Sequence, residues 1–216
     1  MTISRRGVML GGLGLAMLPG AARAGVVCSP FDYRGIQRCD AGLQINLSQA
    51  ASGATFQQKQ NWCWAACIAA VFGYRGYSVS QAEIVEKVFG DDLDQPALGP
   101  QIIGAIDGAW TDRNGRDFYA QGVVLLDGQY SIAHPQALAI AAQELAAEHP
   151  LIVGSMGHAM VLSAMSYLRD VNGNGQPFQF VVRDPWPRPG QSARRMLTPQ
   201  EQANTQFLAR VVIEPA

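Results

Sequence analysis

The chain of 216 residues is 48% hydrophobic and 15% charged, with a formal net charge of −1 at pH 7. This charged fraction, far below the ~25% of typical soluble domains, and the high apolar content exclude an intrinsically disordered chain. The sequence also lacks a collagen-like or heptad repeat, and no apolar run beyond the N-terminus reaches the ~18 residues of a membrane-spanning helix. The length fits one domain with small appendages.

Residues 1–24 have the plan of an export signal peptide. Arg5 and Arg6 precede an apolar stretch from Val8 to Leu18 and a small-residue cleavage site ending at Ala24. The paired arginines resemble a twin-arginine signal, and an uncleaved membrane anchor is the alternative. Cleavage leaves 13 basic and 17 acidic residues, a net charge of −4. The signal predicts an exported bacterial protein, periplasmic or secreted, that binds no membrane after signal removal. Because the mature sequence has no basic cluster, we expect it to bind no nucleic acid.

Residues 25–54 are predicted to form an extended or irregular arm. The arm contains Cys28 and Cys39, two of the four cysteines. Export to an oxidising compartment permits a disulfide between them, which would pin an otherwise frayed terminus. Such a short loop would contribute about 3 kcal/mol on the chain-entropy model. Free or differently paired thiols are the alternative.

Helices are predicted to follow the arm. The segment 62–72 is apolar on all faces and ends at Gly73, as in a buried helix. The other predicted helices span 80–89, opened by a capping box, 100–109, and 134–148, with a loop or hairpin over 110–130. Cys63 and Cys67 lie four residues apart on the first helix, a spacing that suits helix packing better than a disulfide.

Strands are predicted in the remainder of the chain. They span 151–156, 158–167, 178–183 and 207–213, with a turn over 170–175. Because the predicted helices come first in the chain and the predicted strands of an antiparallel sheet follow, we expect an α+β fold of two packed lobes. Residues 55–216 are predicted to form one domain.

Cys63 is a candidate nucleophile because it stands at the start of a buried helix. There the helix dipole and free backbone N–H groups stabilise a thiolate, and the same N–H groups can bind an oxyanion. The alternative is a small buried hydrophobe in a tryptophan-rich core. Cys67, one turn further on, is assigned to the core.

His158 is the candidate base among the three histidines. His134 and His149 stand at the ends of a predicted helix, where solvated histidines are common. His158 instead begins an apolar strand, where an ionisable ring needs a partner or a task. Asp184 ends the next strand and is followed by Pro185 and Trp186. Such an acid can hold the imidazole through Nδ1–H, while the alternative is an Asp-Pro turn paired with Arg183.

The segment Gln57-Gln58-Lys59-Gln60-Asn61-Trp62-Cys63-Trp64-Ala65-Ala66 resembles the nucleophile segment of papain-like cysteine peptidases. The match is nearest to their bacterial secreted branch, and it extends to the peptidases that remove double-glycine leaders from bacteriocins. The order of the motifs along the chain also matches: Cys63 first, then a Gly-His pair, then Asp-Pro-Trp. The resemblance covers residues 55–190. Two departures are Asn61-Trp62 before the nucleophile and Asp184 in place of asparagine.

The resemblance implies a papain-like fold and acyl transfer from a peptide or protein through a Cys63–His158–Asp184 triad. It makes Gln57 the oxyanion donor, with Gln58 and Gln60 as competitors for that role. It assigns Trp186 to shielding of the His–Asp pair, and Trp62 and Trp64 are further candidates for shielding or substrate contact. The site needs no cofactor or metal, since Cys63, Cys67 and His158 lack the spaced second pair of a zinc site. The alternatives are an amidase or transacylase using the same site, a non-catalytic binding module, and a structural protein.

Overall fold

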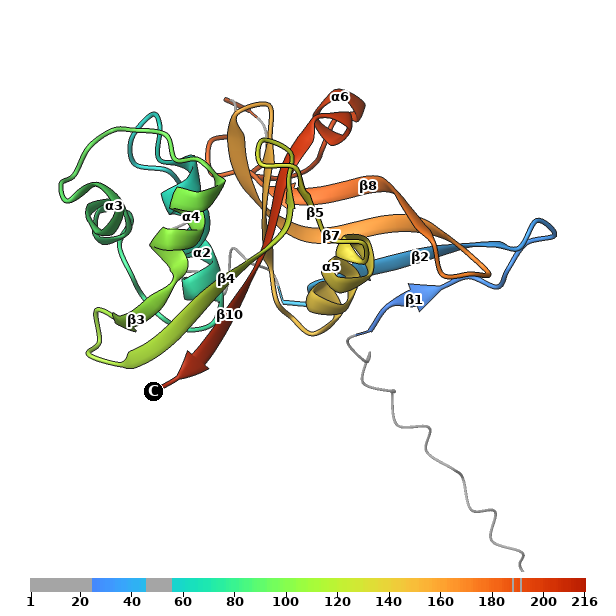
Figure 1. The fold of residues 1–216 in the computed structure, drawn as a ribbon, viewed down its shortest axis with the longest axis horizontal. Helices are drawn as coiled ribbons and strands as arrows, with labels where there is room; N and C mark the ends of the chain where they lie inside the picture. Colours follow the sequence, from blue (N-terminus) through green and yellow to red (C-terminus); the bar gives the residue numbers. More distant parts are fainter. Residues whose placement is uncertain (1–24, 46–55, 188, 191) are drawn as a thin grey trace, which may run out of the picture.

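The computed structural model describes residues 25–45, 56–187, 189–190 and 192–216. The predicted export signal lies outside these residues. Figure 1 shows two halves, with the helices of the first half on one side and a long antiparallel sheet carrying a further helix on the other. Within the described part of the chain, no helix is long and apolar enough to cross a membrane.

The order of elements confirms the predicted α+β fold. The helices are α2 (Cys63–Tyr74), α3 (Gln81–Phe89), α4 (Gly99–Ile106), α5 (Ala137–Ala146) and α6 (Pro199–Ala203). The strands are β1 (Val27–Cys28), β2 (Ile36–Gly42), β3 (Gly108–Thr111), β4 (Asp117–Asp127), β5 (Ile132–Ala133), β6 (Leu151–Ser155), β7 (His158–Asp170), β8 (Gly175–Arg183), β9 (Arg194–Met196) and β10 (Thr205–Pro215). The predicted capping box of Ser80 and Glu83 opens α3, and Gly90 ends it in the left-handed conformation.

The strands form one antiparallel sheet in the order β1-β2-β7-β6-β10-β4-β3, with β8 paired to β7 and β9, and β5 paired to β4. Strand β7 is the hub, because β6 pairs with its residues 158–162, β2 with 164–170 and β8 with 161–169. Strand β10 joins the halves, because it pairs with β4 on one side and β6 on the other.

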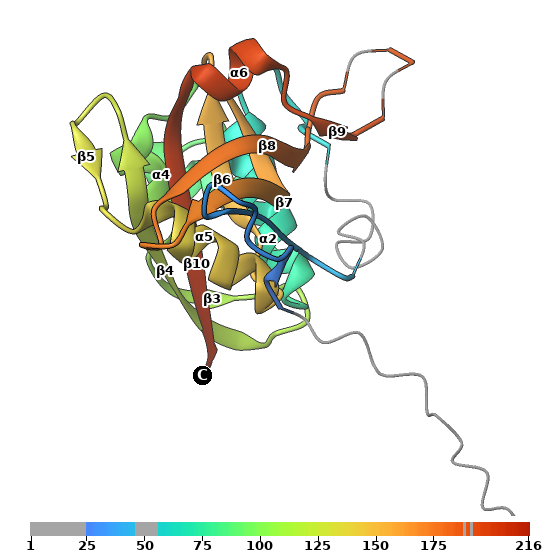
Figure 2. The same cartoon turned by 90° about the vertical axis from the view of Figure 1, so that its right-hand side faces the viewer.

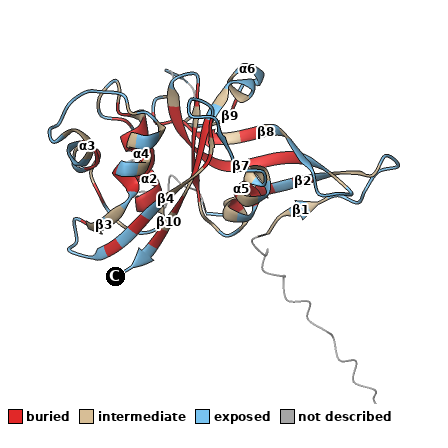
Figure 3. Ribbon diagram, in the orientation of Figure 1, coloured by how far each residue is buried: buried red, intermediate tan, exposed pale blue. Residues whose placement is uncertain are grey.

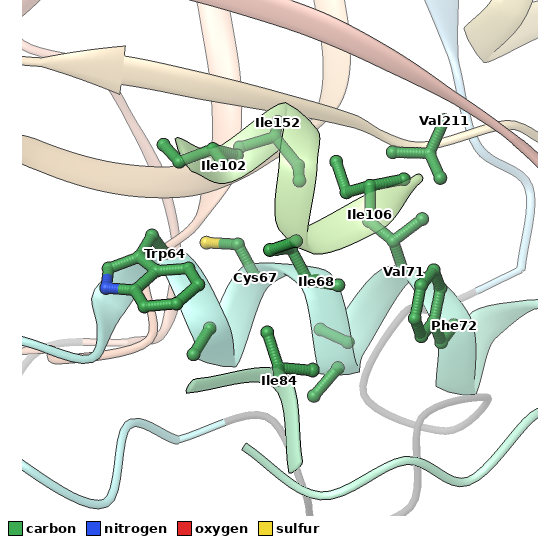
Figure 4. Packing of buried hydrophobic residues seen from close by; sticks show 14 of the residues in the cluster. Trp64, Cys67, Ile68, Val71, Phe72, Ile84, Ile102, Ile106, Ile152 and Val211 are labelled. Atoms are coloured by element: carbon green, nitrogen blue, oxygen red, sulfur yellow. The ribbon is translucent and has the colours of Figure 1, made fainter. Parts of the chain in front are cut away.

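Helix α2 is buried because neighbours surround it, as the red colouring of Figure 3 shows. Cys67, Ile68 and Val71 face α4 and the sheet, and Ile84 of α3 packs from the opposite side (Figure 4). An all-round apolar sequence is what a helix in such a position needs. A second cluster of buried side chains lies between α5 and the sheet.

The arm takes the extended one of its two predicted forms over residues 36–42, because β2 pairs along its length with β7, and the predicted Cys28–Cys39 disulfide joins it to β1. Strand β9 and helix α6 were not predicted. Both segments are short and polar, so their structure depends on contacts with β8, to which β9 pairs.

Candidate active site

Cys63 is the first residue of α2, at the contact between the helical half and the sheet. The residue before it makes no side-chain cap to the first turn. The first N–H groups of this turn therefore lack an intrahelical partner and lie at the positive end of the helix dipole. The predicted position of the thiol at a helix start is confirmed. Cys67 lies beneath it and is only 1% exposed, so its assignment to the core is also confirmed.

The segment that carries Cys63 is fastened to the loop after α3. The indole N–H groups of Trp62 and Trp64 donate to the carbonyls of Leu93 (2.9 Å) and Gln95 (3.1 Å). The backbone N–H of Asn61 donates to Asp94 Oδ1 at 2.8 Å. Both indoles are buried, so Trp62 and Trp64 support the nucleophile from within the core and present no ring surface to a substrate.

His158 is presented by the tight β6–β7 hairpin. Ser155 and His158 are the last paired residues, and the two residues between them have positive φ, 52° at Met156 and 78° at Gly157. Two left-handed residues are typical of a type I′ turn, whose twist matches the strands that it joins. Methionine is an unusual residue at a left-handed position, and Met156 stands only two residues before His158.

Asp184 follows β8 and binds the ring of His158. His158 Nε2 lies 2.7 Å from Asp184 Oδ1, which also accepts the backbone N–H of Trp186 at 2.9 Å. The prediction that Asp184 holds Nδ1 is therefore wrong in its choice of atom. Because Nε2 points to the carboxylate, Nδ1 is left for the hydrogen bond between His158 and Cys63. Arg183, the alternative partner of Asp184, lies with its guanidinium over the ring of Phe56.

These contacts favour a charged pair. Burial alone would raise the pKa of the Cys63 thiol, but hydrogen bonds from His158 and from the backbone of Ala159 and Trp64 lower it below its usual value. Burial would lower the pKa of His158, but the hydrogen bonds to Asp184 and Cys63 raise it to about 9. Burial also opposes ionisation of Asp184, yet His158 and the Trp186 N–H bring its pKa to about 2. These shifts all favour the ionised forms, a thiolate and an imidazolium beside a carboxylate.

A second ion pair, which was not predicted, meets Asp184 from the other side. Arg195 on β9 donates to Asp184 Oδ2 from Nε (3.0 Å) and Nη2 (2.9 Å). Glu201 of α6 accepts from Arg195 at 2.9 Å and 2.7 Å. Figure 2 shows β8, β9 and α6 side by side at one end of the sheet. The Thr198-Pro199-Gln200-Glu201 capping box is a sequence signal for α6, whereas no local pattern singles out Arg195.

Gln57 is buried beside the site. Its amide nitrogen donates to the carbonyls of Lys59 (3.0 Å) and Gln60 (2.7 Å). The amide oxygen has no hydrogen-bond partner within the described structure. Gln58, the competing candidate, is exposed, and its backbone N–H donates to Gln81. Gln57 is therefore the better placed of the two, but both of its amide hydrogens are engaged by the backbone.

A cleft of about 1060 Å³ opens beside His158 and Asp184. Most of the residues that line it are polar, and its three apolar lining residues are exposed: Met156, Trp186 and Met196. Trp186 is 53% exposed, so its ring is available to a molecule in the cleft. The described residues contain no group of three or more His, Cys, Asp or Glu side chains that could hold a metal ion.

The chain matches one family and is similar to several solved structures. Residues 47–210 match the Peptidase_C39-like family. Among solved structures, the peptidase domain of Streptococcus ComA, a bifunctional ABC transporter involved in quorum sensing, is similar at 18% identity with a TM-score of 0.44. That match covers 75% of this chain and 97% of the domain. UfSP from C. elegans is similar at 14% identity and a TM-score of 0.41, over 94% of this chain and 40% of UfSP. No curated protein matches the chain.

Proposed function

The chain belongs to the Peptidase_C39-like family of cysteine peptidases, and we propose that it cleaves peptide bonds outside the bacterial cytoplasm with a Cys63–His158–Asp184 triad. The family implies a peptide or protein substrate. The observation that carries the assignment of the triad is the 2.7 Å contact between His158 Nε2 and Asp184 Oδ1, together with the influence of His158 that lowers the pKa of the Cys63 thiol. A nucleophile, a base and an orienting acid in this order are what thiol acyl transfer requires.

In the proposed reaction the Cys63 thiolate attacks the carbonyl carbon of the scissile bond, and the carbonyl electron pair moves onto oxygen. The His158 imidazolium then gives its proton to the departing amine as the C–N bond breaks, which leaves a thioester on Cys63. Water attacks the thioester, and neutral His158 takes the proton of that water. The C–S bond breaks, the acid product leaves, and the thiolate–imidazolium pair is restored.

The Cys63 backbone N–H is one proposed donor to the oxyanion, because it lies at the free N-terminus of α2. Gln57 is the second, as the family resemblance implies. For this role, substrate must draw one amide hydrogen of Gln57 away from the carbonyl of Lys59 or Gln60. A catalytic hydrogen bond that forms only with substrate bound is common in enzymes without ligand.

Export through a twin-arginine signal over residues 1–24 is the second part of the proposal. The Cys28–Cys39 disulfide supports it, because such bonds persist in oxidising compartments. Replacing Arg5 and Arg6 with lysine should retain the precursor in the cytoplasm, as measured by fractionation of expressing cells. Export of this variant at the normal level would contradict a twin-arginine route.

Alkylation at pH 6 tests the triad without knowledge of the substrate. Iodoacetamide should modify Cys63 about tenfold faster than an ordinary thiol, because the ion pair keeps it ionised while its low pKa reduces its intrinsic nucleophilicity. Mass spectrometry of peptides locates the label. A non-catalytic binding module with the same fold would instead label at the ordinary rate.

Hydrolysis of fluorescent casein completes the test. Cys63→Ala should abolish both labelling and hydrolysis. Cys67→Ala is the matched control, because Cys67 lies one turn away on the same helix and is buried in the core. It should keep both activities. Ordinary labelling of the wild-type thiol, or hydrolysis that survives Cys63→Ala, would refute the proposed function.

A further inference from the structure

The carboxylate of Asp184 has two ends with different partners. Oδ1 receives His158 Nε2 and the Trp186 backbone N–H, whereas Oδ2 receives two donors from Arg195. Asp184 is only 5% exposed, so water does little to hold it. The direction in which Oδ1 faces His158 therefore depends on what holds Oδ2.

Arg195 is fully used by this arrangement. Besides Nε and Nη2 on Asp184, it donates from Nη2 and Nη1 to the two oxygens of Glu201 and from Nη1 to the carbonyl of Met196 at 3.3 Å. These contacts engage all five N–H groups of a guanidinium. Lysine has three donors at a single point and cannot bridge two carboxylates in one plane.

Glu201 fixes Arg195 to the body of the fold. It accepts the backbone N–H of Thr198 at 2.8 Å as part of the α6 capping box, and its carbonyl accepts the hydroxyl of Ser155. Ser155 is the β6 partner of His158. The contacts from His158 through Asp184, Arg195 and Glu201 to Ser155 therefore form a closed ring, because Ser155 pairs with His158 in the β6–β7 hairpin.

The charges along this ring of contacts alternate in sign. His158 carries a positive charge, Asp184 a negative one, Arg195 a positive one and Glu201 a negative one. The other ionisable groups that face His158 or Asp184 are the thiols of Cys63 and Cys67. Without Glu201, the two cations would share one carboxylate, and the surplus positive charge would weaken the hold of His158 on its proton.

Given the proposed triad, we propose that Arg195 is a positioning residue that fixes Asp184 for His158, and that Glu201 balances its charge so that the imidazolium persists. Neither residue touches the reacting atoms. Both act through Asp184, so their effects should appear in the rate and the proton affinity of the site as well as in stability.

The proton on His158 can be followed by comparing two alkylating agents. Iodoacetate is an anion and is attracted by the imidazolium, whereas iodoacetamide is neutral. The ratio of their rates at Cys63 should therefore fall in a step where His158 loses its proton. We expect this step near pH 9 in the wild-type protein, the value to which its partners raise the pKa of His158.

Glu201→Gln removes one charge and keeps a side chain that suits the capping box. The step should move down by roughly 0.5 to 1 pH unit, the effect of one unit charge across a partly buried distance. Glu83→Gln is the matched control, because Glu83 occupies the same position in the α3 capping box and does not line the cleft. It should leave the step where the wild-type protein has it.

Arg195→Lys keeps the charge and loses the planar, five-donor contact. Casein hydrolysis should fall about tenfold or more, as expected when a reacting group is misplaced by a fraction of an ångström, while the step stays near its wild-type pH. Both variants are assayed well below their melting temperatures, so that the rates refer to folded protein.

The outcomes separate the two proposals. Slow labelling of wild-type Cys63 at pH 6 would refute the triad itself. With rapid wild-type labelling, an unmoved step in Glu201→Gln or a wild-type rate in Arg195→Lys would overturn the positioning role. Lower melting temperatures alone, with the step and the rate unchanged, would assign Arg195 and Glu201 to structure only. If one variant fails to fold, the other decides the question.

Discussion

The two sides of the proposed site, Cys63 on one and His158 with Asp184 on the other, hold their groups by different means. Cys63 is held by apolar packing around α2 and by neutral hydrogen bonds from indole N–H groups to the carbonyls of Leu93 and Gln95. His158 and Asp184 are held by a chain of charges that continues through Arg195 to Glu201. The nucleophile side does contain the Lys59–Asp92 ion pair, but both side chains are more than a third exposed. Such a pair contributes little.

This difference predicts which side of the site responds to a change of pH. Packing and neutral hydrogen bonds respond weakly to pH, so the position of the nucleophile should change little between neutral and acid conditions. The acid side depends on ionised groups and should respond strongly. Variants on the two sides can therefore be compared by the kind of change they produce as well as by its size.

The largest effect should come from the histidine at the meeting point of the two sides. His158→Ala should lower casein hydrolysis about 10³-fold, or about 4 kcal/mol in the barrier, because it removes both the acid and the base. Labelling of Cys63 at pH 6 should fall to the rate of an ordinary thiol. His149→Ala is the control, because His149 pairs with Glu144 at the end of α5, away from the cleft. A comparable loss in the control would contradict this assignment.

The Cys28–Cys39 disulfide should affect stability without affecting either side. It links β1 to β2 across a sequence separation of 11 residues, on the part of β7 far from His158. Replacing both cysteines with alanine should lower the free energy of unfolding in urea by about 3 kcal/mol. Labelling of Cys63 per folded molecule should be unchanged. A changed labelling rate would mean that the β2 edge and the cleft are coupled.

Acidification should weaken the charged side selectively. Arg195 holds the pKa of Glu201 at about 2, and Asp184 also has a pKa of about 2, both below their unfolded values. Groups with lowered pKa values stabilise the fold above their unfolded pKa, and this contribution disappears as the pH falls toward the folded value. Between pH 5 and pH 3 the wild-type protein should lose about 2 kcal/mol of unfolding free energy. The Glu201→Gln variant should lose less unfolding free energy over the same range. An equal loss would argue against protonation of Glu201 as a cause of the destabilisation.

The smallest effect is expected on the nucleophile side. Trp62→Phe removes one indole N–H donor to Leu93 and should cost about 1 kcal/mol of stability. Trp110→Phe is a matched control, because its indole donates in the same way to Ile106 at 2.9 Å, away from Cys63. Both variants should lose similar stability in urea, while only Trp62→Phe should slow the labelling of Cys63. Slower labelling in both would show that the anchor near Cys63 has no special role.

The fold was predictable where local patterns carry it. The apolar run of α2, the Ser80–Glu83 capping box and the turn between β3 and β4 depend on residues close together in sequence. The sequence left the segment of β2 as extended or irregular, because its pairing comes from β7, more than 100 residues away. A segment with weak alternation becomes a strand when a neighbouring edge offers hydrogen bonds.

In the candidate site, too, residues marked by a local sequence pattern were predicted and those defined by distant contacts were not. Cys63 and His158 were identified because a helix start and the beginning of an apolar strand make a thiol and an imidazole stand out. Arg195 was missed, because an arginine in a polar segment has no local feature that distinguishes it from a solvated one. Its importance comes from the distance to Asp184, a property of the folded chain only. The same holds for the choice of Nε2 over Nδ1.

Strand β10 has a consequence for the order of events during synthesis. Residues 205–215 pair with both β4 and β6, although this strand comes after every other described strand in the chain. Until these residues leave the ribosome, β4 and β6 lack the partner that joins them, and the sheet that carries His158 cannot close. Contacts between residues so distant in sequence also form slowly. The sheet that carries His158 would therefore close only after residues 205–215 have been synthesised and have paired with β4 and β6.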